Sequence, residues 1–301
     1  MRPFLQAIFD GLASGAIYAA LALALIMVHR ATNIPNFAQG ELAMLSAFVA
    51  WELQNRGFRP FGIDSMPWVV AFIMAILISF VIGFVIERAI IRWVEAAPPL
   101  TLIIITLGLF FVVNSGAGQM FGTVTKIVQT PWPTSPLQVG GAIISWDTIV
   151  LVAVLCAALG LVFALFRYTK LGLGLRGASM NAPSAKLVGI SVGTMLGVGW
   201  GLACALGAIA GTMSAQTLGL QPNIMGSVLV FAFAGAVLGG LDSPVGAVVG
   251  GLTVGLLQAF LSTYWHPYGN SLSLVIAFGL IAVVLLLRPN GIFGRPPVVR
   301  V

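Results

Sequence analysis

One short motif in the sequence has the spacing of a catalytic centre. Residues 189–193 read GISVG, which matches the G-x-S-x-G pattern around the nucleophilic serine of many hydrolases. Such a serine needs a strand-to-helix turn and a histidine base close by. The two histidines are His29, at the end of an apolar segment, and His266, in a short loop that we expect on the opposite face from Ser191. We therefore predict no hydrolase and assign no residue a catalytic role.

The sequence lacks the motifs for nucleotide and metal chemistry. It contains no Gly-Lys pair, so it cannot form the P-loop that holds ATP phosphates. It contains neither HExxH nor a Cys/His cluster with metal-ligand spacing, and Cys156 and Cys204 lie in apolar runs where cysteine serves as a small packing residue. We expect no cofactor and no metal in this chain.

Polar side chains inside apolar segments point to a different kind of site. Such groups are unfavourable in lipid and usually face the interior of a helix bundle. Five of them are our candidates for a translocation pathway: Asn36, Gln39, Glu41, Asn114 and Gln216. Hydrogen bonding between helices is the alternative role for each. Glu41 stands out because its own segment holds no cation, so it needs Arg30, a partner helix or an exposed position to stay charged.

A central stretch, residues 168–192, is polar between two apolar runs: YTKLGLGLRGASMNAPSAKLVGISV. It contains three cations: Lys170, Arg176 and Lys186. A bilayer excludes charge, so this stretch must lie in water. Asn181 and Pro183 suit the start of a short helix over 182–187, and Gly189 suits its end. A stiff polar segment of this kind is a candidate docking site for a soluble partner.

The composition predicts that a membrane-embedded bundle positions these residues. The chain has 301 residues, of which 59% are hydrophobic and 7% charged, and its mean hydropathy is +1.06. Soluble domains carry about 25% charged residues, so this surface faces mainly lipid or other membrane subunits. The net charge of +6 comes from basic residues scattered over short loops, and we predict no nucleic-acid partner. The fold class is an all-α polytopic membrane protein.

Nine segments approach the roughly 20 apolar residues that a membrane crossing requires. They are about 9–28, 33–51, 68–87, 99–120, 146–167, 195–218, 222–240, 244–263 and 270–288. We predict a single transmembrane domain over residues 1–301 with about eight or nine membrane segments. One or two of these are expected to be broken or re-entrant, namely 33–51, which opens with NIPNFAQGE, and 222–240, which is short and glycine-rich.

The distribution of Lys and Arg over the loops predicts the orientation. If all nine segments cross, ten of the 14 basic residues share the side of the central loop and four lie opposite. This excess places the loop at about 168–194 and the C-terminus in the cytoplasm. It places the N-terminus outside, unless 33–51 is re-entrant. The outer loop at 121–145 is then either a receiving surface for a soluble partner or an inert connector.

Glycines recur at Gly-xxx-Gly spacing in the C-terminal half of the chain. The pairs and triplets are 193/197/201, 207/211, 235/239, 246/250 and 251/255. This spacing lets helix backbones approach closely, so we predict a tightly packed bundle.

Four motifs together resemble a known family. They are NFAQGELAMLSAF at 36–48, TKLGLGLRGASMNAPSAKLVGI at 169–190, AVLGGLDSPVGAVVGGLTVGLL at 236–257 and LLLRPNGIFG at 285–294. In this order they resemble LivH-type permeases, the inner-membrane subunits of bacterial branched-chain amino acid ABC importers. The chain departs from the family pattern at Leu173 and Gln258, where arginine and glutamate are common.

The resemblance implies partners and a coupling role. The partners would be a second, LivM-type permease, two ABC ATPase subunits that hold ATP and magnesium, and a periplasmic substrate-binding protein. The central loop would dock on an ATPase subunit through these residues: Gly172, Arg176, Ala178, Asn181, Ala185, Lys186, Leu187, Gly189 and Ile190. The implied function is a permease subunit that moves branched-chain or related small amino acids across the bacterial inner membrane.

Other functions stay open at this point. Relatives of the family are similar to transporters for urea, short-chain amides and aromatic acids. A stand-alone channel or secondary transporter would need a complete pore or coupling ions within one chain. An intramembrane enzyme would rest on the GISVG motif alone.

Overall fold

The computed structural model describes residues 2–32, 34–57, 64–94, 97–265, 269–288 and 291–294. Each of the nine predicted segments holds a helix. They are α1 (Arg2–Thr32), α2 (Gln39–Arg56), α3 (Trp68–Ile86), α5 (Pro99–Phe121), α6 (Trp146–Tyr168), α9 (Val192–Leu218), α10 (Met225–Gly239), α11 (Pro244–Tyr264) and α12 (Gly269–Leu287). In the described residues, six helices are long and apolar enough to cross a membrane, and two shorter apolar helices accompany them. The predicted all-α polytopic membrane class is confirmed.

Shorter elements connect these helices. A π-helical turn, η2 (Glu87–Ile91), and α4 (Arg92–Val94) extend α3. The polar central stretch forms two helices, α7 (Lys170–Met180) and α8 (Ala182–Leu187), and a hairpin of β1 (Leu137–Val139) and β2 (Ala142–Ile144) precedes α6. We did not predict α7, because the glycines in its sequence disfavour a helix. Gly172 is tolerated there because it packs against the Leu165 carbonyl of α6, where a side chain would clash.

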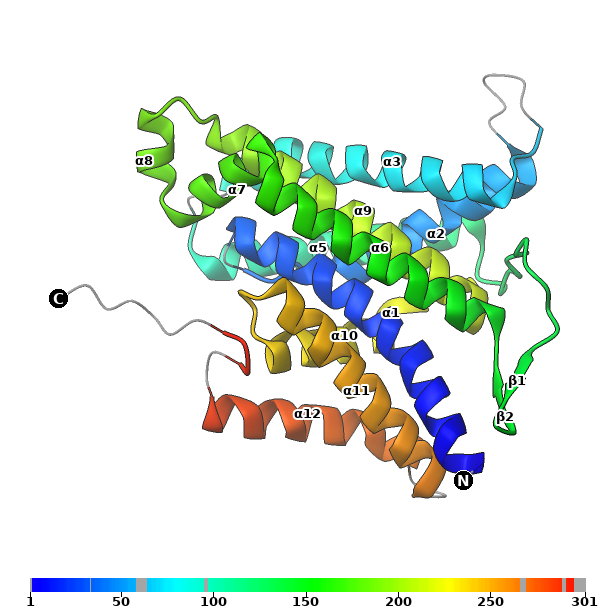
Figure 1. Ribbon diagram of the computed structural model, residues 1–301. Coiled ribbons are helices and arrows are strands. Elements are labelled where there is room, and N and C mark those ends of the chain that lie inside the picture. The colour runs from blue at the N-terminus through cyan, green and yellow to red at the C-terminus, as the bar shows by residue number, and fades with distance from the viewer. Residues whose placement is uncertain are drawn as a thin grey trace.

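The α8 helix and the β1–β2 hairpin lie at opposite ends of the bundle (Figure 1). We call these the α8 end and the hairpin end, and residues 168–194 the α7–α8 segment. Helix α1 begins at the hairpin end, and residues 291–294 lie at the α8 end (Figure 1). The start of α1 is therefore on the opposite side from the α7–α8 segment. Three of the basic residues used to predict the orientation, Arg59, Arg295 and Arg300, lie outside the described residues.

The segment predicted at 33–51 contains the first of the two expected helix breaks. The Gln39 amide, in the first turn of α2, donates a hydrogen bond of 2.9 Å to the Ala203 carbonyl, which lies near the middle of α9. The other end of α2 reaches the hairpin end, where the Gln54 amide donates to the Gln129 carbonyl at 2.8 Å. Residues 34–38 thus carry the chain in non-helical form from α1 to the bundle centre.

The segment predicted at 222–240 also contains a helix break, which lies before the start of α10. Met225 and Leu229, in the first turns of α10, pack against Gly40 near the start of α2. The helix then runs to the α8 end, where Gly239 meets Gly246 in the first turn of α11. Asn223 precedes α10 with a positive φ of 72°, which asparagine tolerates better than most residues. Both predicted helix breaks are confirmed, and their helices begin side by side inside the protein.

Glycine contacts bring the crossing helices close together. Gly255 of α11 lies against the backbone of Gly15 in α1, and Gly211 of α9 lies against the Ala43 carbonyl of α2. A Cβ at Gly255 or Gly211 would overlap main-chain atoms that cannot move independently. The tight packing predicted from the Gly-xxx-Gly spacing is confirmed.

Candidate translocation and coupling sites

The two helix breaks bring a cluster of polar side chains together. The Asn114 amide of α5 donates to Glu41 Oε2 at 3.0 Å and to Asn223 Oδ1 at 2.8 Å. Glu41 is fully buried, and its Oε1 atom has no hydrogen-bond partner among the described residues. Next to it, the Asn36 amide donates to Gln39 Oε1 at 3.3 Å. The carboxylate of Glu41 is thus met by the neutral amide of a partner helix.

Four of the five predicted pathway residues belong to this region, and Gln216 does not. The side chains of Asn36 and Gln39 form hydrogen bonds with each other and with the backbone of Ala38 and Ala203. Gln216 lies 13 residues beyond Ala203 on α9, which corresponds to about 20 Å along the helix axis. Its amide nitrogen is buried with no hydrogen-bond partner in the described part of the chain.

The cluster opens toward the outer face of α5. Asn114 is partly buried, whereas Asn223 is exposed. The neighbouring α5 side chains Phe111 and Val112 are 65% and 69% exposed. This face is therefore available to lipid or to another membrane subunit, and the polar cluster lies at its edge.

A second polar cavity was missed by the sequence reasoning. It has a volume of about 330 Å³ and is lined by Ser14, Tyr18, Ser227 and Gln258 together with apolar residues of α1, α9, α10 and α12. The Tyr18 hydroxyl donates to Gln258 Oε1 at 2.5 Å. In the sequence, Ser14 and Tyr18 are four residues apart, which puts both on one face of a helix. This spacing could have indicated the cavity.

The α7–α8 segment is shaped by local capping. The Thr169 hydroxyl accepts from the Gly172 N–H at 3.0 Å, and Asn181 Oδ1 accepts from the Ser184 N–H at 3.0 Å. Gly189 follows α8 with a φ of 84°, and the Ile190 N–H donates to the Ala185 carbonyl at 3.0 Å. The predicted short helix over 182–187, with its start and end residues, is confirmed.

The nine residues predicted for coupling divide into two groups. Six of them build the segment, by packing in its small core or against α6, by capping, or by turning the chain: Gly172, Ala178, Asn181, Ala185, Gly189 and Ile190. Three are exposed and available to a partner: Arg176, Lys186 and Leu187. The prediction missed Met180 and Val188, which are 84% and 76% exposed beside Leu187 at 89%. The outward surface of the segment is thus more apolar than predicted.

Arg92 links the π-helical turn to the end of the α7–α8 segment. Arg92 Nη2 lies 2.9 Å from Glu87 Oε2 and donates to the Gly193 carbonyl at 2.7 Å. Glu87 is 1% exposed, and Gly193 lies in the first turn of α9, at the end of the segment. The pair spans five residues of the π-helical turn, a spacing that an α-helical pattern does not bring together.

The GISVG motif does not lie on a strand-to-helix turn. Ser191 directly precedes α9 and follows the turn that ends α8. His29 belongs to α1, and His266 lies outside the described residues.

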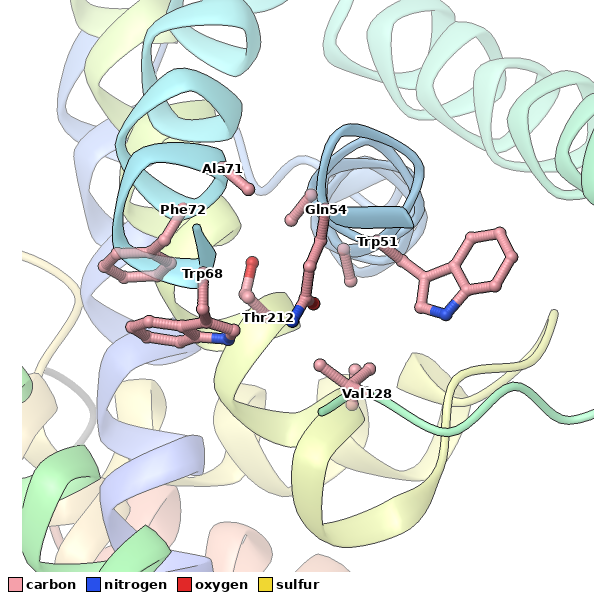
Figure 2. Close-up of a pocket in the computed structure, with 10 residues that line it drawn as sticks. Trp51, Gln54, Trp68, Ala71, Phe72, Val128 and Thr212 are labelled. Carbon is pink, nitrogen blue, oxygen red and sulfur yellow. The ribbon is translucent and has the colours of Figure 1, made fainter. Parts of the chain in front are cut away.

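The hairpin end holds a small pocket between α2, α3 and α9 (Figure 2). Its volume is about 10 Å³, and Trp68 and Phe72 line one side while Val128 closes another (Figure 2). The hydroxyl of Thr212 faces it and has no hydrogen-bond partner among the described residues. This space is about the size of one water molecule and is too small for an amino acid.

Comparison with known proteins identifies the family. The family described as "Branched-chain amino acid transport system / permease component" matches residues 7–285. The chain is 29% identical to the high-affinity branched-chain amino acid transport system permease protein BraD of Pseudomonas aeruginosa, and 30% identical to LivH of Salmonella typhimurium. Each alignment covers 99% of this chain and 98% of the relative.

A solved structure, PsaBC from Streptococcus pneumoniae in complex with Fab, matches with a TM-score of 0.46 and 17% identity, over 96% of this chain and 93% of that one. That likeness is too weak to support a conclusion. The family match and the relatives that align over nearly their whole length are enough to assign the family. The chain belongs to the family of branched-chain amino acid transport system permease components.

Proposed function

We propose that the chain is one of two permease subunits of an ATP-driven importer of branched-chain or related small amino acids in a bacterial inner membrane. Its partners would be a second permease, two ABC ATPase subunits, which hold ATP and magnesium, and a periplasmic binding protein. The α7–α8 segment would face the cytoplasm. The family membership and the transport function of the relatives support this assignment.

The observation that carries the proposal is the form of the α7–α8 segment. It holds its shape through its own caps and small core, while Leu187, Val188 and Met180 are exposed outside the bundle. Exposed apolar side chains on a preformed helix–turn–helix are suited to a groove on a soluble partner, because little ordering is needed on binding. Movement of that partner would pass to α3 through the hydrogen bond between Arg92 and Gly193.

The substrate pathway would run along α5, past the two helix breaks. A zwitterionic amino acid needs an acceptor for its ammonium group and donors for its carboxylate. Glu41 Oε1 is an acceptor with no partner among the described residues, and the amides of Asn114 and Asn223 can donate and accept. Helices that begin inside a bundle also turn their partial positive charge toward a midplane site. The exposed face of α5 would be covered by the second permease.

Reconstitution tests the proposal. We expect ATP-dependent uptake of radiolabelled leucine into proteoliposomes that contain this chain, its co-encoded permease and ATPases, and external binding protein. Excess unlabelled isoleucine should compete, whereas urea and benzoate should not. The purified chain alone should neither hydrolyse ATP nor admit leucine. Leucine entry through the chain alone would overturn the proposal in favour of a channel, and competition by urea would overturn the substrate assignment.

A further inference from the structure

A cavity of about 540 Å³ opens on the side of the bundle at the α8 end. It lies where the ends of α1 and α6 meet α7 and the start of α11 (Figure 1). Three of its lining residues are arginines: Arg30, Arg167 and Arg176. Most of the remaining lining is apolar and comes from α6: Leu159, Val162, Phe163 and Phe166. The cavity therefore combines a cationic rim with an apolar body.

Two of these arginines lie against aromatic rings. The Arg30 guanidinium carbon lies 5.4 Å from the centre of the Phe166 ring, and that of Arg167 lies 5.9 Å from the centre of Phe163. A cation–π contact restrains a guanidinium but leaves its full positive charge. The planar guanidinium of Arg167 can therefore still present several N–H donors to an anion.

Two arginines of the cavity rim, Arg167 and Arg176, have no carboxylate partner among the described residues. Two ion pairs occur among the described residues: Glu52–Arg56 and Glu87–Arg92. Neither Arg167 nor Arg176 is thus paired within 4.0 Å with a described carboxylate. Arg176 Nε donates to the Gly172 carbonyl at 3.3 Å, which uses one of its five donors. An anionic ligand would complement this rim.

The position of the rim identifies the kind of anion. Arg30 and Arg167 lie in the last turns of α1 and α6, both long and apolar enough to cross a membrane. The ends of such helices lie at the depth of lipid headgroups. The apolar body of the cavity extends along α6 toward the bilayer core, where an acyl chain lies. Basic pockets between membrane helices on the cytoplasmic side are known to bind anionic lipid headgroups.

We propose that this cavity binds one anionic phospholipid. Its phosphate lies between Arg167 and Arg176, because arginines favour bidentate hydrogen bonds to phosphate oxygens, and an acyl chain packs along α6. Phosphatidylglycerol satisfies the site because it carries a net negative charge. Phosphatidylcholine does not, because its own choline group neutralises the phosphate. The bound lipid bridges α6 and α7 and thereby fixes the position of the α7–α8 segment.

Native mass spectrometry of the assembled transporter in detergent tests the role of charge. With equal phosphatidylglycerol and phosphatidylcholine added, we expect the wild type to retain one phosphatidylglycerol. The double variant Arg167→Gln/Arg176→Gln should reduce that retention at least 10-fold. Its matched control is Arg88→Gln/Arg288→Gln, which removes two exposed arginines from the same end, outside the cavity lining, and should retain the lipid. Equal retention in both double variants, or no preference for phosphatidylglycerol, would overturn the proposal.

A second pair of variants tests the apolar body without altering charge. Gly160 lines the cavity, and a Cβ there meets no atom within 4 Å, so Gly160→Phe should fold and fill the space. It should reduce phosphatidylglycerol retention, whereas Gly279→Phe, at an equally open position on α12, should not. A benzophenone side chain at position 160 should crosslink to phospholipid. Crosslinking mainly to a second polypeptide would show that a protein covers the cavity and would refute the lipid assignment.

Discussion

The hairpin end and the α8 end of the bundle are held together by different means. At the hairpin end, side chains of α2 form hydrogen bonds with the loop that follows α5. The Trp51 indole donates to the Ile127 carbonyl at 3.2 Å, and the Gln54 amide donates to the Gln129 carbonyl at 2.8 Å. At the α8 end, the α7–α8 segment has its own small core and keeps apolar side chains exposed.

This difference indicates a division of mechanical roles. Segments bonded to neighbouring helices at several points move with the bundle, so the hairpin end offers a fixed surface. The α7–α8 segment touches the bundle through α1, through the ends of α6 and α9, and through Arg92. It can transmit a displacement only along those contacts. Four substitutions test this contrast, beginning with the largest expected effect.

Gly189→Pro should abolish transport while the protein still inserts. Proline cannot adopt the φ of 84° found at Gly189, and it removes the N–H that donates to the Lys186 carbonyl at 3.1 Å. Gly189→Asn is the matched control, because asparagine tolerates this conformation and a Cβ there meets no atom within 4 Å. Leucine uptake and surface labelling are the measurements. Normal uptake by inserted Gly189→Pro would refute the rigid-segment role.

Arg92→Gln should destabilise the link between the segment and α3 by about 3 kcal/mol, because it leaves the buried Glu87 carboxylate without its cation. The double variant Glu87→Gln/Arg92→Gln should recover much of this loss. Thermal unfolding in detergent gives the stability, and substrate-stimulated ATP hydrolysis in the assembled transporter gives the coupling. If both variants kept wild-type coupling, force would not pass through this ion pair.

Leu187→Glu should weaken ATPase binding about 30-fold, since truncating or charging a central interface anchor typically costs about 2 kcal/mol. Its counterpart at the hairpin end is Val124→Glu, because Val124 is 80% exposed and Leu187 is 89% exposed. Co-purification of the ATPases should fall for the first variant and be unchanged for the second. Equal loss from both would remove the functional distinction between the two ends.

Trp132→Phe should have the smallest effect and should be confined to the hairpin end. The Trp132 indole donates to Asp147 Oδ1 at 2.7 Å and packs edge-on against Trp68. Phenylalanine keeps an aromatic ring but loses the hydrogen bond, which is worth about 1 kcal/mol. We expect roughly 5-fold faster proteolysis within 121–145 and unchanged ATPase co-purification. Unchanged proteolysis would show that this bond does not hold the loop.

Features set by nearby residues were predictable from the sequence. Helix α8 depends on Asn181 at its start and Gly189 after its end, eight residues apart, so the signals are local. The membrane segments follow from the length of each apolar run. Both helix breaks were also visible, because NIPNFAQGE cannot form an apolar helix and 222–240 is short and glycine-rich.

Features that join distant residues were not predictable. Asn114 and Asn223 are 109 residues apart, and Tyr18 and Gln258 are 240 apart. Asn223 was missed because it lies outside any regular polar pattern, and its importance depends on the neighbouring break in α2. The contact between Arg92 and Gly193 depends on a π-helical turn that no pattern of residues predicted.

The sequence by itself determined the membrane class, the crossings, the two breaks and the short helix α8. Each of these follows from hydrophobicity or capping within about 20 residues. Tertiary structure alone decided which polar groups meet at the breaks, which coupling residues build the α7–α8 segment, and which side chains it exposes. These outcomes depend on how close the helices approach one another, which is set by backbone contacts between glycines on separate helices.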